Sequence, residues 1–216
     1  MELISVNVAE PQAVIAGGQE FKTAIFKKPV RGPVRVKTLN LEGDCQADLR
    51  VHGGPDKAVY AYSWQNTLYW RHTLQREDLG PGTFGENLTV DGLTDGEIGI
   101  GDVLEIGTPR LQVTQPRIPC FKLGIALDLP EFPKLFHRAG RNGFYLRVLR
   151  EGLLAAGDAI RLIPAEDGRR MTIAEFVRIA TSKSFTAEEL DRVLNLPALP
   201  HSWKTHLTEK LQARGK

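Results

Sequence analysis

Cysteine is scarce in this chain, and its scarcity excludes two common ways of stabilising a fold. Cys45 and Cys120 are the only cysteines among 216 residues. Two cysteines cannot build the disulfide framework of a small secreted domain, and no Cys/His cluster has the spacing of a structural zinc site. We therefore expect neither disulfides nor structural zinc to hold this protein together.

Long apolar runs are also missing. No stretch approaches the roughly 20 apolar residues that a membrane helix needs. The first residues, Met1 to Ser5, carry an acid where a secretion signal would carry basic residues. These features predict a soluble, cytoplasmic protein without a membrane partner.

The chain has no large excess of charge of one sign. Its formal net charge is +2, so no general field would attract a nucleic acid polymer, and anion recognition must come from local clusters. Its 42% hydrophobic and 25% charged content suits an ordinary globular core. We expect a small molecule as the partner.

Short apolar segments separated by glycine and proline dominate the first three quarters of the chain. They predict a β-rich, mainly antiparallel body, with a barrel as the favoured form. Helices are expected only at 64–76 and 132–138, so a doubly wound α/β sheet is disfavoured. The expected strands are 2–8, 34–41, 58–62, 88–90, 103–106, 111–114, 143–149 and 159–163.

After Pro164 the pattern changes to a polar linker and three amphipathic helices. We expect a β domain over 1–165 and a three-helix domain over 166–216 that docks on it, because about 50 residues rarely hold a stable core alone. The helix starts are marked by Thr172 with Glu175, by Thr186 with Glu189, and by Pro200.

Cys120 lies on a turn braced by Pro116 and Pro119, between the basic residues Arg117 and Lys122. The prolines restrict the backbone, and nearby positive charge favours the thiolate. From these residues alone, Cys120 could be a nucleophile, a ligand of a soft metal, or a buried side chain that fills space.

A second loop holds His52, Gly53, Gly54 and Lys57. The glycines allow the backbone to approach a ligand, and the strand that follows Lys57 fixes where its side chain leaves the loop. A solvated tight turn is the alternative. His52 has no partner histidine at ligand spacing, so hydrogen bonding or bracing of the loop is favoured, and Cys45 is expected to be a bystander.

A third loop, 82–88, contains Gly85 and Asn87. It offers backbone N–H groups and an amide to a polar ligand. It lacks the lysine and spacing of a phosphate-binding P-loop, and the glycines around Ile100 lack the third glycine of a dinucleotide fingerprint.

A fourth cluster is basic. Six Lys/Arg, among them Arg117 and Arg141, lie between Pro116 and Arg147 and suit a phosphate, unless they form an ordinary solvated face. No Gly-x-Ser-x-Gly motif supports a serine hydrolase. A cysteine hydrolase that pairs Cys120 with His52 or His137 stays open.

In their order, these clusters resemble the MOSC-domain family, named for the C-terminal domain of molybdenum cofactor sulfurase, and in particular its YiiM-like branch. The resemblance covers most of residues 1–165, and the helical tail is similar to the extension of that branch. It is carried by Gly43-Asp44-x-Gln46-Ala47-Asp48, His52-Gly53-Gly54-x-Asp56-Lys57-Ala58-Val59, Gly82-Thr83-Phe84-Gly85-Glu86-Asn87-Leu88, Gly101-Asp102 and Gln115-Pro116-Arg117-x-Pro119-Cys120.

The resemblance implies a fold similar to the pyruvate-kinase β-barrel domain and a site for the molybdenum cofactor, a pterin with a dithiolene and a phosphate. It implies that Cys120 is the thiolate ligand of molybdenum. It further implies cofactor contacts by a set of residues around this cysteine: Lys57, Arg117, His52, Asn87, Gly85 and Arg141.

The activity implied by the resemblance is reduction of N-hydroxylated compounds, including N-hydroxylated purine-type bases. With Cys120 committed, Cys45 alone cannot hold an iron–sulfur cluster, so electrons must come from a separate flavin or iron–sulfur protein. Two other functions stay open: a carrier of the cofactor or of persulfide sulfur on Cys120, and a binding module acting through the terminal helices.

Overall fold

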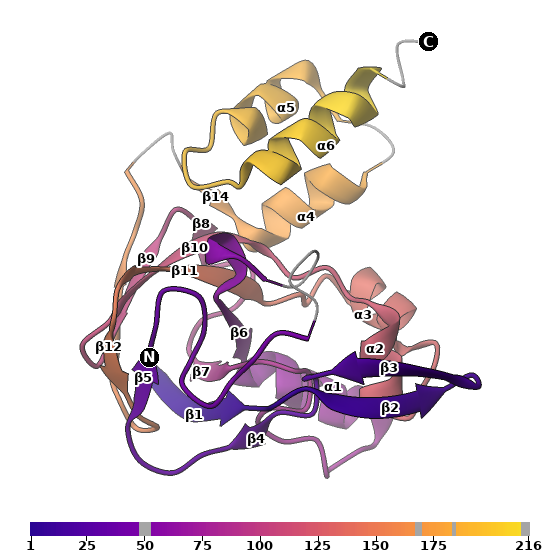
Figure 1. The fold of residues 1–216 in the computed structure, drawn as a ribbon. Coiled ribbons are helices and arrows are strands. Elements are labelled where there is room, and N and C mark those ends of the chain that lie inside the picture. Colours follow the sequence, from indigo (N-terminus) through magenta and orange to yellow (C-terminus); the bar gives the residue numbers. More distant parts are fainter. Residues whose placement is uncertain (48–52, 167–169, 183–184, 213–216) are drawn as a thin grey trace.

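One large, curled sheet forms the body of the protein. In a computed structural model of the chain, described for residues 1–47, 53–166, 170–182 and 185–212, eight strands lie in the order β13-β9-β10-β11-β6-β7-β1-β4 (Figure 1). All neighbours are antiparallel except β6 and β7, which are parallel. In chain order the strands are β1 (Glu2–Val8), β4 (Lys28–Pro29), β6 (Val59–Ser63), β7 (Leu88–Asp91), β9 (Val103–Ile106), β10 (Arg110–Pro116), β11 (Phe144–Arg150) and β13 (Ile160–Ile163).

The two ends of this sheet approach each other without a continuous ladder. A single bridge joins Glu2 to Ala159, and the N–H of Leu3 donates to the Asp158 carbonyl at 2.9 Å. Within the described ranges the strand ladders therefore do not close a barrel. The expectation of a mainly β fold with helices is confirmed. In place of the predicted barrel, the structure has a curled sheet whose two ends are joined by one isolated bridge.

Three short strand pairs supplement the sheet. They are the hairpin of β2 (Gln12–Ala16) and β3 (Gln19–Thr23), the pair of β5 (Val34–Val36) and β12 (Gly152–Leu154), and the pair of β8 (Gly99–Ile100) and β14 (Met171–Thr172). The last pair matters most for the architecture, because β14 runs directly into the first C-terminal helix and fastens it to the body.

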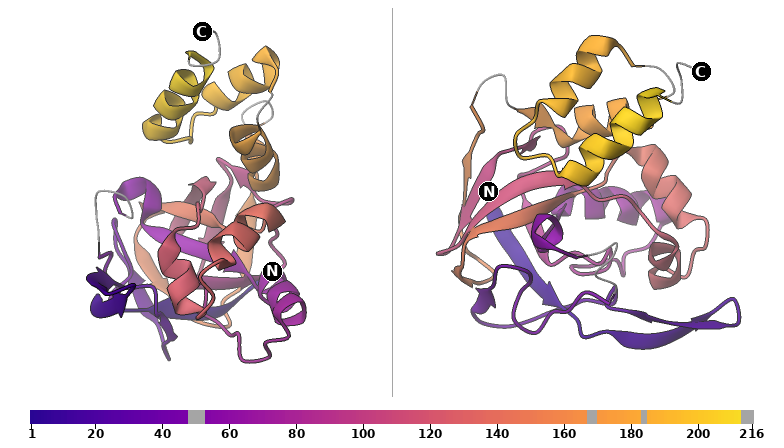
Figure 2. Two further views of the ribbon diagram at one scale, coloured as in Figure 1. Left: turned by 90° about the vertical axis from the view of Figure 1, so that its right-hand side faces the viewer. Right: turned by 45° about the horizontal axis from the view of Figure 1, so that its top comes forward.

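Six α-helices lie in two groups in the described part of the chain. α1 to α3 lie beside the sheet, and α4 to α6 gather at one end of the molecule (Figure 2). No helix in the ranges given above is both long and apolar enough to cross a membrane. The helices are α1 (Trp64–Leu74), α2 (Phe121–Ala126), α3 (Phe132–Ala139), α4 (Ile173–Thr181), α5 (Ala187–Leu194) and α6 (His201–Gln212), with a 3₁₀ turn η1 at Pro55–Lys57.

The buried side chains form two clusters. The larger runs from the sheet, for example Leu104, into α4 and α6 through Phe176 and Leu207, so the core continues across the predicted boundary at residue 165. The smaller is rich in aromatic rings from α1, α3 and β6, and it supports the side of the sheet on which the site lies.

Candidate functional site

Cys120 occupies the junction between a strand and a helix. β10 leads through a short turn into α2, and Cys120, in extended conformation, is the last residue before that helix. The N–H of Arg117 donates to the Gly143 carbonyl at 3.2 Å, and Asn142 Nδ2 donates to the Arg117 carbonyl at 2.8 Å. With Pro119 restricting the backbone, the direction of the half-buried, free Cys120 thiol is fixed against the start of β11.

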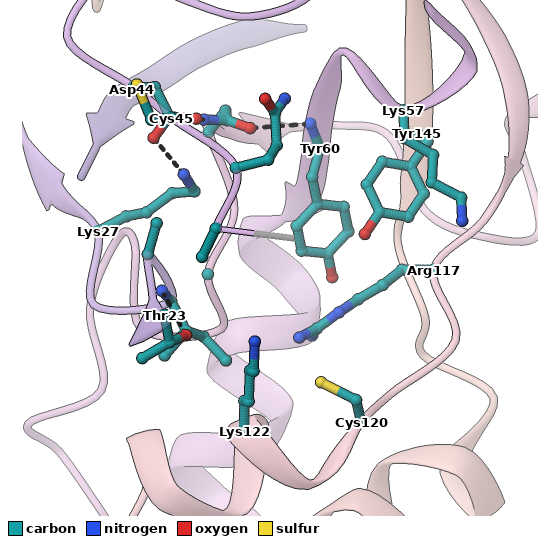
Figure 3. Close-up of a pocket in the computed structure, with 16 residues that line it drawn as sticks. Thr23, Lys27, Asp44, Cys45, Lys57, Tyr60, Arg117, Cys120, Lys122 and Tyr145 are labelled. Carbon is teal, nitrogen blue, oxygen red and sulfur yellow. Dashed lines mark hydrogen bonds and ion pairs between the residues drawn. The ribbon is translucent and has the colours of Figure 1, made fainter. Parts of the chain in front are cut away.

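A cavity opens in front of this thiol (Figure 3). Tyr60 from β6, Tyr145 from β11, Arg117, and Lys122 from α2 line one side, and the loops that follow β3 and β5 line the other. The space between these side chains is about 100 Å³. A benzene molecule occupies a cavity of about 150 Å³, so this space by itself holds one small group.

Arg117 carries the clearest sign of a missing ligand. The residue is 6% exposed, and its guanidinium lies over the ring of Tyr60 at 5.0 Å and that of Phe136 at 5.6 Å. Its buried Nη1 has no hydrogen-bond partner among the described residues. Buried polar groups are almost always satisfied, and the cost of leaving part of a cation unpaired is high, so an anion at this position would complete the site.

Further cations line the same space. Lys27 forms a buried ion pair with Asp44, and burial lowers the pKa of Lys27 although the Asp44 carboxylate opposes this. Partial burial likewise lowers the pKa of Lys57. Among the described residues, Arg117, Lys122 and these two lysines give the wall four basic side chains against the one carboxylate of Asp44. This distribution suits an anionic group.

Asn87 and Gly85 line the cavity but act on the protein itself. Asn87 Oδ1 accepts from the Tyr60 N–H at 3.1 Å, and its Nδ2 donates to Asp44 Oδ2 at 2.9 Å. Gly85 has a φ of +78°, and a Cβ there would lie 2.9 Å from the side chain of Ile25. Asn87 thus orients two wall residues, and Gly85 allows the chain after β3 to pack closely.

Glu86 is a fully buried acid beneath this wall. Its carboxylate accepts from the N–H of Gly82 at 2.7 Å, the N–H of Phe84 at 3.1 Å and the hydroxyl of Thr89 at 2.9 Å. Burial raises its pKa to about 7, against the lowering effect of these donors. The Glu86 carboxylate holds the Gly82–Gly85 turn in place and does not line the cavity.

A second buried acid, Asp95, braces the Cys120 turn from below. Its Oδ1 accepts from the N–H groups of Asn142 and Gly143 at 2.9 and 2.8 Å, and its Oδ2 accepts from Asn66 Nδ2 at 2.7 Å. Sequence reasoning missed this residue, because nothing in its local pattern shows that it meets a segment 47 positions away.

Arg141, predicted to contact the cofactor, does not line the cavity. Its Nη1 donates to Asn66 Oδ1 at 2.8 Å, and its guanidinium lies 4.0 Å from the ring centre of Tyr69. Both partners belong to α1, so the side chain turns toward that helix and does not line the cavity. A cation–π contact and one hydrogen bond to an amide hold the guanidinium that was expected to bind a phosphate.

The remaining basic cluster is dispersed as well. Of its six members only Arg117 and Lys122 line the cavity, and Arg147 is paired with Asp56. His137 is exposed on α3 and lines neither of the two cavities beside Cys120, so the structure does not bring it to the thiol. His52, predicted to contact a cofactor, lies outside the described residues.

Several wall residues were not anticipated, and three of them bear on the chemistry of the site. Lys27 and Tyr145 come from segments without a recognisable motif, and only the fold brings them to Cys120. Cys45, expected to be a bystander, lines the cavity on the wall opposite Cys120 (Figure 3). Its position next to Asp44, in one of the motif segments, could have indicated that Cys45 lines the site.

The described residues contain no group of three or more His, Cys, Asp or Glu side chains that could hold a metal ion. A metal at Cys120 would therefore need most of its ligands from a cofactor. A single thiolate beside cations fits such a cofactor. The cations would bind the anionic part of the cofactor, and the thiolate would bind its soft metal.

The MOSC domain family matches residues 48–161, more than half of the chain. The chain belongs to the MOSC domain family. This membership, predicted from the loop motifs, is confirmed. Four of the five motif segments contribute residues to the cavity wall, and Gly101-Asp102 does not.

Relatives agree with this assignment. "Uncharacterized protein YflK" of Bacillus subtilis is 38% identical over 96% of this chain and 93% of its own length. The crystal structure of YiiM from Geobacillus stearothermophilus superimposes on this protein with a TM-score of 0.81 at 32% sequence identity. The superposition covers 97% of this chain and 98% of the YiiM chain. A protein of Gibberella moniliformis named "Reductase" is 37% identical over 68% of this chain but only 26% of its own length. This MOSC protein therefore resembles YiiM along its whole length, including the helical tail.

Proposed function

We propose that the protein is a molybdenum-cofactor-dependent reductase of N-hydroxylated compounds, such as N-hydroxylated purine-type bases, working in the cytoplasm. The observation that carries the proposal is the unpartnered, buried Arg117 Nη1 beside a positioned Cys120 thiol, inside a wall of cations. That combination offers one soft ligand for a metal and, beside it, one subsite for an anionic group of the same cofactor.

The residues of the site divide the work of holding such a cofactor. Cys120 would ligate the metal, and Arg117, Lys57 and Lys122 would hold an anionic group of the cofactor. The limited volume in front of Cys120 fits a group of that size. When bound, the cofactor supplies a metal that exchanges two electrons with the substrate.

The overall reaction would convert R–NH–OH, two electrons and two protons into R–NH₂ and water. Here the protein's tasks are to orient the substrate beside Cys120 and to supply hydrogen bonds and protons. Burial raises the pKa of Tyr145, so its hydroxyl stays protonated at neutral pH and can donate to a substrate oxygen. Tyr60 stays protonated for the same reason, and its hydroxyl donates to the Asn142 carbonyl at 2.9 Å.

Electrons would come from a separate flavin or iron–sulfur protein. Two cysteines on opposite walls of one cavity cannot ligate an iron–sulfur cluster, which needs four ligands. The relative named "Reductase" is much longer than the segment this chain matches. Its name supports a redox role for a domain of this kind.

The test compares the two cavity cysteines. The wild type, Cys120→Ala and Cys45→Ala are produced in a host that makes the molybdenum cofactor, and their metal and pterin contents are measured. We expect cofactor in the wild type and in Cys45→Ala, and at least a tenfold loss in Cys120→Ala. Reduction of an N-hydroxylated adenine with a chemical electron donor should follow the metal content.

Cys45→Ala is the matched control because both thiols line the same cavity. Equal molybdenum in Cys120→Ala and the wild type would remove Cys120 as the ligand. A loaded wild type that carries transferable sulfane sulfur on Cys120 and reduces no N-hydroxylated base would instead show a carrier.

A further inference from the structure

A second cavity lies on the other side of Cys120, between the sheet and helix α6. It shares Lys57, Cys120 and Tyr145 with the first cavity. Its volume is about 560 Å³, within the range of small-molecule sites and several times that of the first. A group held at Cys120 would therefore be reachable from two sides, one narrow and one wide.

The chemistry of the wide cavity differs from that of the narrow one. Pro116, Ile118 and Pro119 of the Cys120 turn form one wall, and α6 contributes Trp203 and His206. Apart from the shared Lys57, no charged side chain of fixed sign lines it within the described part of the chain. An indole face, two pyrrolidine rings and a few hydrogen-bonding groups suit a planar, uncharged heteroaromatic molecule.

Trp203 is held in place before any ligand arrives. Its Nε1 donates to Gln115 Oε1 at 2.8 Å, and its ring meets Phe176 edge-on at 5.0 Å. Gln115 is itself 2% exposed, and its Nε2 donates to the Asp56 carbonyl at 3.2 Å. Because Gln115 begins the segment that carries Cys120, the indole and the thiol are positioned by one continuous stretch of chain.

His206 lies one turn beyond Trp203 on the same face of α6, with the two rings edge-on at 5.8 Å. Both border the cavity, so a flat ligand against the indole would come within reach of an imidazole able to donate or accept a hydrogen bond. A purine-type base presents such donors and acceptors around its edge.

We propose that α6 forms the substrate site: Trp203 stacks the planar base, His206 hydrogen-bonds its edge, and the reacting nitrogen points to Cys120. The C-terminal helices are then part of the active site and not only a cover for the sheet. This inference rests on the proposed reductase function for its choice of ligand, but the base-binding step can be measured without turnover.

The experiment uses the full chain purified from a cofactor-competent host and adenine as the probe. Binding is measured by isothermal titration for the wild type, Trp203→Leu, Trp203→Phe and His206→Gln. We expect adenine affinity to fall about tenfold or more in Trp203→Leu, less in Trp203→Phe, and severalfold in His206→Gln, at unchanged molybdenum content. Trp64→Leu and His72→Gln on α1 are the matched controls and should bind as the wild type does.

Two results would overturn the inference. One is an adenine affinity that is absent in the wild type or unchanged by Trp203→Leu. The other is a loss of molybdenum in both Trp203→Leu and Trp203→Phe with unaltered thermal unfolding, because the wide cavity would then hold the cofactor. Adenine binding that depends on Trp203 in a protein without reductase activity would support the site while rejecting the proposed reaction.

Discussion

Two arginines that look equivalent in the sequence have different surroundings in the structure. Arg117 and Arg141 both lie in the basic segment, and both were expected to hold a phosphate. Arg117 has a buried nitrogen without a partner among the described residues, whereas Arg141 is engaged by Asn66 and Tyr69. The difference predicts which one a cofactor needs.

Arg117→Gln should therefore reduce bound cofactor, measured as molybdenum and pterin per protein, by about tenfold to a hundredfold, the size expected for a lost charge-assisted hydrogen bond. Arg141→Gln is the control and should leave the content unchanged. Arg117→Lys should give an intermediate loss, since it keeps the charge without the planar fork. An equal loss in the two glutamine variants would contradict the assignment.

Glu86 gives the residue-scale prediction about pH. Its folded-state pKa of about 7 lies above the ordinary value of 4.5 because burial disfavours the charged form. A raised pKa means that the folded protein holds this proton more tightly than the unfolded chain does. Its contribution to stability is therefore fully present below about pH 4.5 and is lost as pH rises through about 7.

The free energy of unfolding of the wild type, relative to Glu86→Gln, should fall by up to about 3 kcal/mol between these limits, because the amide does not titrate. Urea unfolding of both proteins at several pH values measures the difference. Glu97→Gln is the control, since hydrogen bonds from Thr94 lower the pKa of Glu97 and keep it ionised across this window. A difference between wild type and Glu86→Gln that is constant with pH would show that Glu86 does not titrate there.

At the scale of elements, the sequence predicted best where the signal is local. The cap at Thr172 accepts from the Glu175 N–H at 3.1 Å, and Thr186 and Glu189 form a complete capping box. The main strands are also found close to their predicted positions, since their apolar residues face one continuous core.

The elements that were missed depend on distant partners or on weak patterns. β12 is three residues long and pairs with a strand far away in the sequence, so its own residues carry too little apolar alternation to identify it. Its partner β5 was predicted, but it ends at Val36 and does not extend to Leu41. The β2–β3 hairpin is largely exposed, but its turn was readable: Gly17 and Gly18 both have positive φ, as a tight two-residue hairpin turn requires.

The site residues likewise divide into those that the sequence predicted and those that depend on the folded arrangement. The family resemblance assigned Cys120, Arg117 and Lys57 to one site, and all three line the same cavity in the structure. Lys27 and the α6 residues could not be predicted, since their approach to Cys120 depends on how the sheet curls and where the helices dock.

At the scale of the whole molecule, the question is whether the helical tail and the sheet are one cooperative unit. β14 pairs with β8, α4 packs on β10, and the buried cluster continues from Leu104 to Phe176. The predicted division at residue 165 assigns these partners to different domains. A shared core predicts that they unfold together.

Phe176→Ala tests this directly, because the ring is fully buried and also contacts Trp203. Its loss should cost about 3–5 kcal/mol. Urea unfolding is followed by two probes in a Trp203→Phe background. Near-ultraviolet circular dichroism then reports on Trp64 and Trp70 of α1, and the far-ultraviolet signal reports on the helices. In a single unit both transitions coincide and shift together to lower urea, while Thr205→Ala on the exposed face of α6 shifts neither. If only the far-ultraviolet transition moves, the helices are an independent domain, and the wall that Trp203 gives the second cavity can open without unfolding the sheet.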